Sequence, residues 1–273
     1  MDLWQAVVLG VVEGVTEFLP VSSTGHLTIT EKLMGLSIDD DSITAFTAVI
    51  QMGAIVAVLL YFFRDIVGLL RAGLGGVRDP ARRGTQDWRL ACAVVVGSIP
   101  IGIVGLAAKD FISGPLRSLW VVGVALIAWS SVMVYAERRP RATRHEADVT
   151  LRDALAVGLV QCVALVPGVS RSGATISAGL LRDLDRVTAT RLSFFLSIPA
   201  LTAAGLLELK DSLNGGVGLG PTLLGTVVAF VVAYASIAWL LRFVAHHSIA
   251  QFVPYRVALG LVVLAVLAIT GSS

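Results

Sequence analysis

The chain has 273 residues, of which 56% are hydrophobic and only 15% are charged, and its mean hydropathy is +0.83. These values exclude an ordinary soluble domain. The formal net charge is +2, and no basic patch is interleaved with aromatic residues, which argues against nucleic acid as a partner. The composition predicts a single, all-α integral membrane domain over residues 1–273.

Residues 3–30 begin with an apolar run that is broken by Pro20 and a cluster of Ser, Thr and Gly. Irregular backbone at membrane depth is tolerated only where protein or a water-filled cavity satisfies its amides. We therefore predict a re-entrant, broken helix beside a polar cavity; the alternative is a proline-kinked spanning helix. The first ten residues have no positively charged region, so we expect no cleaved signal peptide.

Six apolar runs are each long enough to cross a hydrocarbon core of about 30 Å. They cover residues 43–63, 90–108, 118–136, 190–209, 221–244 and 254–270. We predict six full transmembrane helices, three before and three after a second broken segment. Tyr255 flanks the last run, as aromatic anchors at the membrane interface do.

The second broken segment, residues 151–181, repeats the pattern of the first at an offset of 148 residues. Shared positions include Gly10 with Gly158 and Ser22 with Ser170, and Glu13 faces its near-isostere Gln161. Each copy holds one re-entrant segment and three spans, and an odd number of spans reverses the direction of entry. We predict two inverted repeats, residues 1–148 and 149–273.

Basic residues are distributed unequally between alternate loops. The stretches 64–89, 137–152, 182–191 and 242–256 hold sixteen Arg, whereas the opposite loops hold Lys32, Lys109, Arg117 and Lys210. The positive-inside rule places the Arg-rich loops in the cytoplasm and both termini outside. The first broken segment then opens outward and the second inward, and their tips are expected to meet near the midplane.

Polar side chains gather at both breaks. Arg171 offers five donors in a fixed fork that suits carboxylate or phosphate; the alternative is a structural ion pair that holds the repeats together. The amides of helices beginning near Gly25 and Gly173 would add to an anion site. The residues predicted to bind phosphate are Ser22, Thr24, Ser170, Arg171, Ser172 and Thr175.

Glu13 and Glu17 lie four residues apart and so share one helix face. Such a pair repels phosphate directly but holds a divalent cation that bridges phosphate oxygens. Ser23 and His26 lie one helical turn apart, which supplies a nucleophile with a nearby base, or a histidine that attacks phosphorus itself. A small-residue motif, Gly10 to Gly14, is typical of helix packing in membranes, so part of the segment is scaffold.

The strings EGVTEFLPVSSTGH (residues 13–26) and PGVSRSGAT (167–175) resemble the two signature motifs of the bacterial undecaprenyl pyrophosphate phosphatases, the bacitracin-resistance family. The likeness extends over the full length. It implies an enzyme of the bacterial plasma membrane that hydrolyses undecaprenyl pyrophosphate to undecaprenyl phosphate and inorganic phosphate, and so recycles the lipid carrier of peptidoglycan and cell-wall synthesis. It also implies bacitracin resistance, dependence on Mg²⁺ or Ca²⁺, and a site reached from the outer face.

The resemblance carries the family's E-x-x-x-E pair onto Glu13 and Glu17, which would organise the metal. We expect Ser23 to be the nucleophile, His26 the general acid/base and Arg171 the clamp on the phosphates. Attack by His26 or by a metal-bound water stays open. The alternative function is a transporter or flippase for phosphate or for the polyprenyl phosphate lipid, because inverted repeats with broken helices are common in transporters. The sequence also leaves a homodimer open.

Overall fold

Helices form the regular structure of the residues that the computed structural model describes, namely 1–37, 40–108, 116, 118–139, 144–212 and 217–270. The α-helices are α1 (Leu3–Thr16), α2 (Ser23–Leu33), α3 (Asp41–Tyr61), α4 (Phe63–Arg78), α5 (Gln86–Ala107), α7 (Leu119–Arg138), α8 (Leu151–Gln161), α9 (Arg171–Leu181), α10 (Arg186–Ser212), α11 (Leu219–His246) and α12 (Val253–Thr270). Short 3₁₀ turns join some of them, among them Pro80–Gly84 and Cys162–Leu165. The all-α prediction is confirmed for this part of the chain.

Six helices in the described residues are long and apolar enough to cross a membrane, as predicted. They are the segments Ser42–Tyr61, Gln86–Ala107, Leu119–Arg138, Arg186–Gly205, Leu219–His246 and Ile249–Thr270. Three follow the first broken segment and three follow the second. Two of them contain an internal proline, Pro100 in α5 and Pro199 in α10.

The two broken segments, α1 with α2 and α8 with α9, share one local geometry. Ser22 and Ser170 both have a positive φ, 81° and 75°, and each caps the helix that follows. The Ser22 hydroxyl accepts from the amide of Gly25, and the Ser170 hydroxyl accepts from the amide of Gly173. A serine cap satisfies an amide of the first turn, so the second helices begin at Ser23 and Arg171, two residues earlier than predicted.

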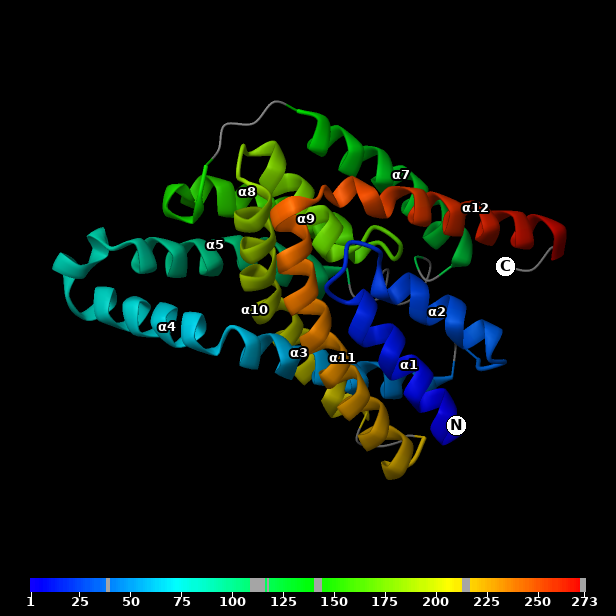
Figure 1. Ribbon diagram of the computed structural model, residues 1–273. Helices are drawn as coiled ribbons and strands as arrows, with labels where there is room; N and C mark the ends of the chain where they lie inside the picture. Colours follow the sequence, from blue (N-terminus) through cyan, green and yellow to red (C-terminus); the bar gives the residue numbers. More distant parts are fainter. Residues whose placement is uncertain (38–39, 109–115, 117, 140–143, 213–216, 271–273) are drawn as a thin grey trace.

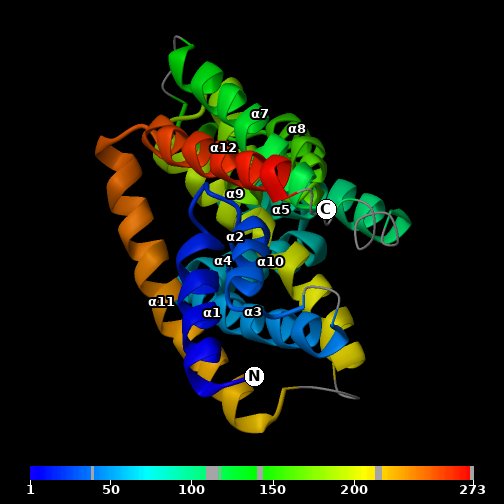
Figure 2. The same ribbon diagram turned by 90° about the vertical axis from the view of Figure 1, so that its right-hand side faces the viewer.

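The breaks lie at the centre of the molecule (Figure 1). α1 and α2 lie on one side of this centre and α8 and α9 on another, while α7 and α12 run side by side along the top of the view. In Figure 2, α11 runs down one side of the molecule from the start of α12, and α1 lies beside its lower part. Phe18 at the first break packs edge-on against Phe194 of α10, with ring centroids 5.5 Å apart, and so joins the break to the main apolar core.

Glycines allow the first helix of each broken segment to touch a membrane helix of the other half. A Cβ added at Gly10 would lie 2.6 Å from the carbonyl oxygen of Gly225 in α11. One added at Gly158 in α8 would lie 2.0 Å from the carbonyl oxygen of Gly97 in α5. The Gly10–Gly14 face is therefore an internal packing surface, as expected for scaffold.

The stretch 64–89, which the charge analysis treats as a loop, is largely helical. It contains most of α4 and the turn Pro80–Gly84, and α4 packs against α5 where Gly76 faces Trp88. Apolar residues at helical spacing explain the helix. Three glycines and two arginines in its second half lower its mean hydropathy, which is why the segment does not stand out as a membrane span.

Candidate functional site

The two breaks contact each other directly, as predicted for the tips of the two segments. The amide of Gly168 donates to the hydroxyl oxygen of Ser22 over 3.1 Å, and the hydroxyl of Ser172 donates to the carbonyl oxygen of Leu19 over 2.8 Å. These residues are 146 and 153 positions apart in the chain. The polar residues of two motifs that are far apart in the sequence therefore lie side by side in the structure.

Glu17 is the centre of the polar cluster. Its side chain is only 4% exposed, and one carboxylate oxygen accepts from Nη2 of Arg171 over 2.8 Å. The other oxygen accepts from the hydroxyl of Ser23 over 2.5 Å. The buried carboxylate thus pairs with a cation and orients a hydroxyl, which is the arrangement that activates an oxygen nucleophile.

His26 is held by two other groups. Its Nδ1 lies 2.7 Å from the carbonyl oxygen of Ser22, which can only accept, so Nδ1 carries a proton. In the neutral ring, Nε2 is then an acceptor, and it lies 2.6 Å from the hydroxyl of Tyr255, whose ring stacks on the imidazole. Tyr255, expected to be an interfacial anchor, therefore belongs to the site. The hydrogen bond of Ser23 goes to Glu17 and not to His26.

The predicted phosphate-binding residues fall into two groups by burial. The hydroxyls of Ser22, Ser170, Ser172 and Thr175 are buried and hydrogen-bonded within and between the breaks. Thr24 is exposed, and Ser23, His26 and Arg171 are partly exposed. The second group forms the accessible face of the cluster, whereas the first shapes the loops beneath it.

Glu13 lies one helical turn before Glu17 and is 1% exposed. Among the described residues, no group of three or more His, Cys, Asp or Glu is placed to hold a metal ion. Two carboxylates nevertheless fit a hard cation that completes its shell with phosphate oxygens, which is how Mg²⁺ is commonly bound in phosphoryl-transfer sites. The donor set of Glu13 and Glu17 therefore fits a cation that binds together with a phosphorylated substrate.

Arg256 also belongs to the site, and the prediction that it lies in a cytoplasmic loop is wrong. The residue is 0% exposed and lies in the first turn of α12. Its guanidinium donates to the carbonyl oxygens of Pro20 and Gly168 over 3.0 Å each, and to the hydroxyl of Ser130 over 3.1 Å. One cation thereby ties both breaks to α7. An arginine inside an apolar run was the available signal.

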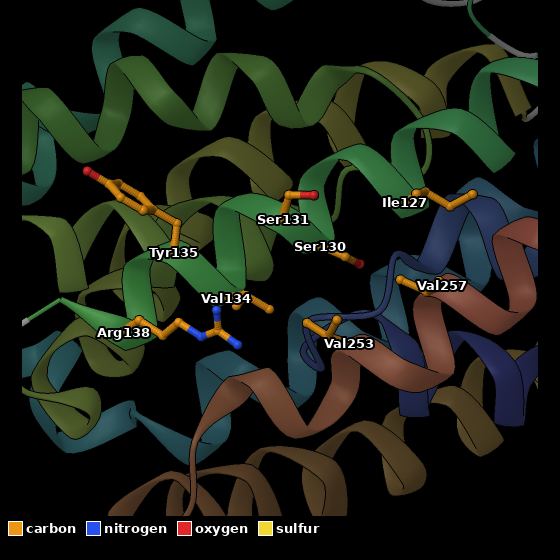
Figure 3. Close-up of a pocket in the computed structure, with 8 residues that line it drawn as sticks. All are labelled: Ile127, Ser130, Ser131, Val134, Tyr135, Arg138, Val253 and Val257. Atoms are coloured by element: carbon orange, nitrogen blue, oxygen red, sulfur yellow. The ribbon is translucent and has the colours of Figure 1, made fainter.

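A groove of about 400 Å³ lies between α7 and α12 (Figure 3). Its lining comprises Ile127, Ser130, Ser131, Val134, Tyr135, Arg138, Val253 and Val257. Ser130 connects it to the site, because the hydroxyl that lines the groove also accepts from Arg256. The groove is mostly apolar, and neither Glu17 nor Ser23 is among its lining residues.

Comparison with known proteins agrees with the two motifs. Residues 6–262 match the model of the family described as bacitracin resistance protein BacA. The match covers both breaks, every helix from α2 to α11, and parts of α1 and α12.

Curated proteins from several bacteria are similar to the chain over almost their whole length. Undecaprenyl-diphosphatase 3 of Frankia casuarinae is 61% identical over 97% of the chain and 96% of its own length. Proteins named undecaprenyl-diphosphatase from Acidothermus cellulolyticus and Cutibacterium acnes are 56% and 51% identical, over 96% and 97% of the chain and 95% and 96% of their own lengths.

Proposed function

The chain belongs to the bacitracin resistance protein BacA family, and from this premise we infer that it is a membrane phosphatase that hydrolyses undecaprenyl pyrophosphate to undecaprenyl phosphate and inorganic phosphate. The reaction returns the lipid carrier to cell-wall synthesis, and the family role in bacitracin resistance follows from the same activity. The chain is a multi-pass membrane protein, so its lipid substrate reaches it within the bilayer.

The observation that carries this function is the contact of Glu17 with both Ser23 and Arg171. A transporter needs a cation for its anionic cargo, but it has no use for a hydroxyl held by a buried carboxylate at 2.5 Å. A phosphatase needs both. The geometry therefore favours hydrolysis over transport as the primary activity.

We propose that Ser23 attacks the terminal phosphorus. Its Oγ forms the new P–O bond, the P–O bond to the lipid phosphate breaks, and Glu17 accepts the hydroxyl proton. Undecaprenyl phosphate leaves, and water then cleaves the phosphoserine to inorganic phosphate. Arg171 neutralises charge on the equatorial oxygens, which is the main catalytic demand of phosphoryl transfer. Direct attack by His26 is the alternative; as general acid/base, His26 would relay protons at Nε2.

Glu13 and Glu17 are the residues that would hold Mg²⁺ or Ca²⁺. A bound divalent cation supplies charge neutralisation and orientation of the phosphate oxygens. The chain itself contributes Arg171, which pairs with Glu17, and the exposed Thr24 in the first turn of α2. The buried hydroxyls of Ser22, Ser170, Ser172 and Thr175 would bind phosphate through the loop amides that they position.

We further propose that the two halves are inverted repeats and that both broken segments are re-entrant. The shared serine caps support the repeat, and so does the packing. α1 packs on α11 and α8 packs on α5, and these partners are in each case the second membrane helix of the other half. The proposed boundaries remain 1–148 and 149–273.

The proposed location is the bacterial plasma membrane, with the Arg-rich segments in the cytoplasm and the site open to the outer face. In Figure 1 the N-terminus and the end of α12 lie on the right, and the turn between α4 and α5 lies at the far left. This separation supports opposite sides for the termini and that turn. Lys109 and Arg117, used in the charge argument, lie outside the described residues.

Phosphate release from undecaprenyl pyrophosphate by the detergent-purified chain, with and without a chelator, tests the proposed function. We expect release that requires a divalent cation and is lost in Arg171→Ala. Absence of release from folded protein at any cation concentration would overturn the phosphatase, and uptake of labelled lipid phosphate by proteoliposomes would then test the transporter.

A further inference from the structure

We propose that α4 is an interfacial helix that docks on the anionic lipid surface of the cytoplasmic leaflet. The side of the membrane rests on the orientation proposed above, but the lipid contact rests on α4 itself. Three properties of the helix carry the inference: an exposed apolar stripe, a parallel stripe of arginine, and a length that is too short to span the bilayer.

The apolar stripe of α4 is open over its whole length. Phe63, Leu70, Leu74 and Val77 are 60%, 61%, 61% and 69% exposed. At 100° per residue these four positions lie within about 40° of one another's mean direction, so they form one line along the helix. The side that faces α5 is a different one, because Gly76 meets Trp88 and Gly73 approaches Ala91.

A cationic stripe runs beside the apolar one. Arg64, Arg71 and Arg78 recur every seven residues and are all exposed. Helical geometry places them about 90° from the centre of the apolar stripe, on the side away from α5. Long arginine side chains in this position reach the head groups while the apolar stripe enters the acyl region, which is the pattern of helices that lie in a membrane interface.

The start of α4 is tied to other Arg-rich segments by ion pairs, and the turn after its end folds back on the helix itself. Asp65 at its start accepts from Arg191 over 2.7 Å, and the same arginine donates to Glu146, in the turn before α8, over 2.6 Å. At its end, Arg83 folds back and donates to the carbonyl oxygen of Gly76 over 2.8 Å. With 16 residues at about 1.5 Å each, α4 is too short to cross a hydrocarbon core of about 30 Å.

Charge selects an anionic lipid surface as the occupant of this face. The exposed arginines Arg64, Arg71 and Arg78 flank the apolar stripe along all four turns, so a second copy docked here would bring two cationic stripes together. A phospholipid leaflet with acidic head groups offers the complementary charge and an apolar layer at the right depth.

A nitroxide at Leu74→Cys, in full-length protein with Cys92→Ala and Cys162→Ala, tests the docking. The protein is placed in nanodiscs of phosphatidylcholine alone or with added phosphatidylglycerol, and collisions with oxygen and with a water-soluble nickel complex are compared. With phosphatidylglycerol we expect the label about 5–10 Å below the head groups and protected from nickel. A label at Arg71→Cys is expected to stay accessible to nickel.

The charge requirement is tested by Arg64→Gln, Arg71→Gln and Arg78→Gln combined, with Arg138→Gln, Arg139→Gln and Arg152→Gln as the matched control. In the first set, phosphatidylglycerol is expected no longer to move the label at position 74 deeper into the bilayer. In the control set, the label is expected to move as in the unmodified protein. A nickel-accessible label at position 74 in both lipids would overturn the proposal, as would spin–spin broadening, which would identify a second copy. Phosphate release is measured separately on each variant, so that failure of the docking proposal can be told apart from failure of the proposed phosphatase function.

Discussion

At the scale of single residues, the site is defined by the hydrogen-bond partners of Ser23 and His26. The hydroxyl of Ser23 points its proton at Glu17, and the imidazole of His26 is fixed by Ser22 and Tyr255. A sequence in which serine and histidine lie one turn apart predicts that they act on each other. The structure differs from this prediction, because the Ser23 hydroxyl donates to the carboxylate of Glu17, six residues earlier, and not to the imidazole of His26.

Glu17→Gln is expected to lower kcat for phosphate release by about 10²–10⁴-fold, the usual range for loss of general-base catalysis. The amide keeps the size of the side chain but cannot accept the proton of Ser23. Ser23→Ala is expected to fall to a similar level, and the double variant to fall no further, because residues that act as a unit are not additive. Asp87→Asn, an exposed change in α5, is the control. Near-normal kcat in Glu17→Gln would refute its role as base.

Tyr255→Phe is expected to lower kcat/KM about fivefold, which corresponds to the loss of one hydrogen bond of about 1 kcal/mol. The phenyl ring can still stack on His26, so the change isolates the hydroxyl that fixes Nε2. Tyr234→Phe, within the aromatic cluster of Tyr61 and Phe230, is the matched control. An increase in activity would show instead that Tyr255 competes with the substrate for Nε2.

The residues of the site differ in how far the sequence could predict them. Glu17, Ser23 and Arg171 stand in dense polar strings inside apolar segments, and polarity at membrane depth is a strong signal. Arg256 is a single arginine at the start of the last apolar run, which is a weaker signal because an arginine there also fits the loop before the run. Only the fold shows that this residue reaches carbonyl groups 88 and 236 positions away.

At the scale of elements, close helix contacts through glycine set the positions of the breaks. α8 approaches α5 so closely that the backbone of Gly97 occupies the space of a side chain at position 158. α1 approaches α11 in the same way at Gly10. Because each contact fixes the helix that leads into a break, the distance between Glu17 and Arg171 depends on packing far from either side chain.

Gly158→Ala tests this dependence. A methyl group there would lie 2.0 Å from the Gly97 carbonyl oxygen, so α8 and α5 must separate. We expect a loss of about 1–3 kcal/mol of stability, the usual cost of overpacking, together with reduced phosphate release. Gly102→Ala is the control, since nothing lies within 4 Å of its added Cβ. The thermal unfolding midpoint in detergent is the measurement, and an unchanged midpoint and activity in Gly158→Ala would contradict the packing argument.

Hydropathy predicted all six membrane helices to within a few residues, because burial in lipid demands long apolar runs. It did not predict α4, which has the periodicity of a helix but carries Arg64, Arg71 and Arg78 on one side. Nor did it predict the true starts of α2 and α9. Those starts are set by single serine caps, and the positive φ at Ser22 and Ser170 is a tertiary feature of two loops that hold each other in place.

At the scale of the whole molecule, each half completes the other. The arginine of the second break neutralises the carboxylate of the first, and a residue of the last helix holds both loops. Neither half contains a complete site. If the halves are inverted, the site is reached from the side of the membrane opposite to the Arg-rich segments.

Single cysteines at Ser37 and Thr85, in a background with Cys92→Ala and Cys162→Ala, test that arrangement in intact cells. Both positions are exposed, and they lie on opposite sides of α3 in the chain. An impermeant maleimide is expected to label Ser37→Cys from outside and to reach Thr85→Cys only after permeabilisation, because the Arg-rich segment stays in the cytoplasm. Labelling of Thr85→Cys in intact cells would reverse the orientation. The site would then open to the cytoplasm.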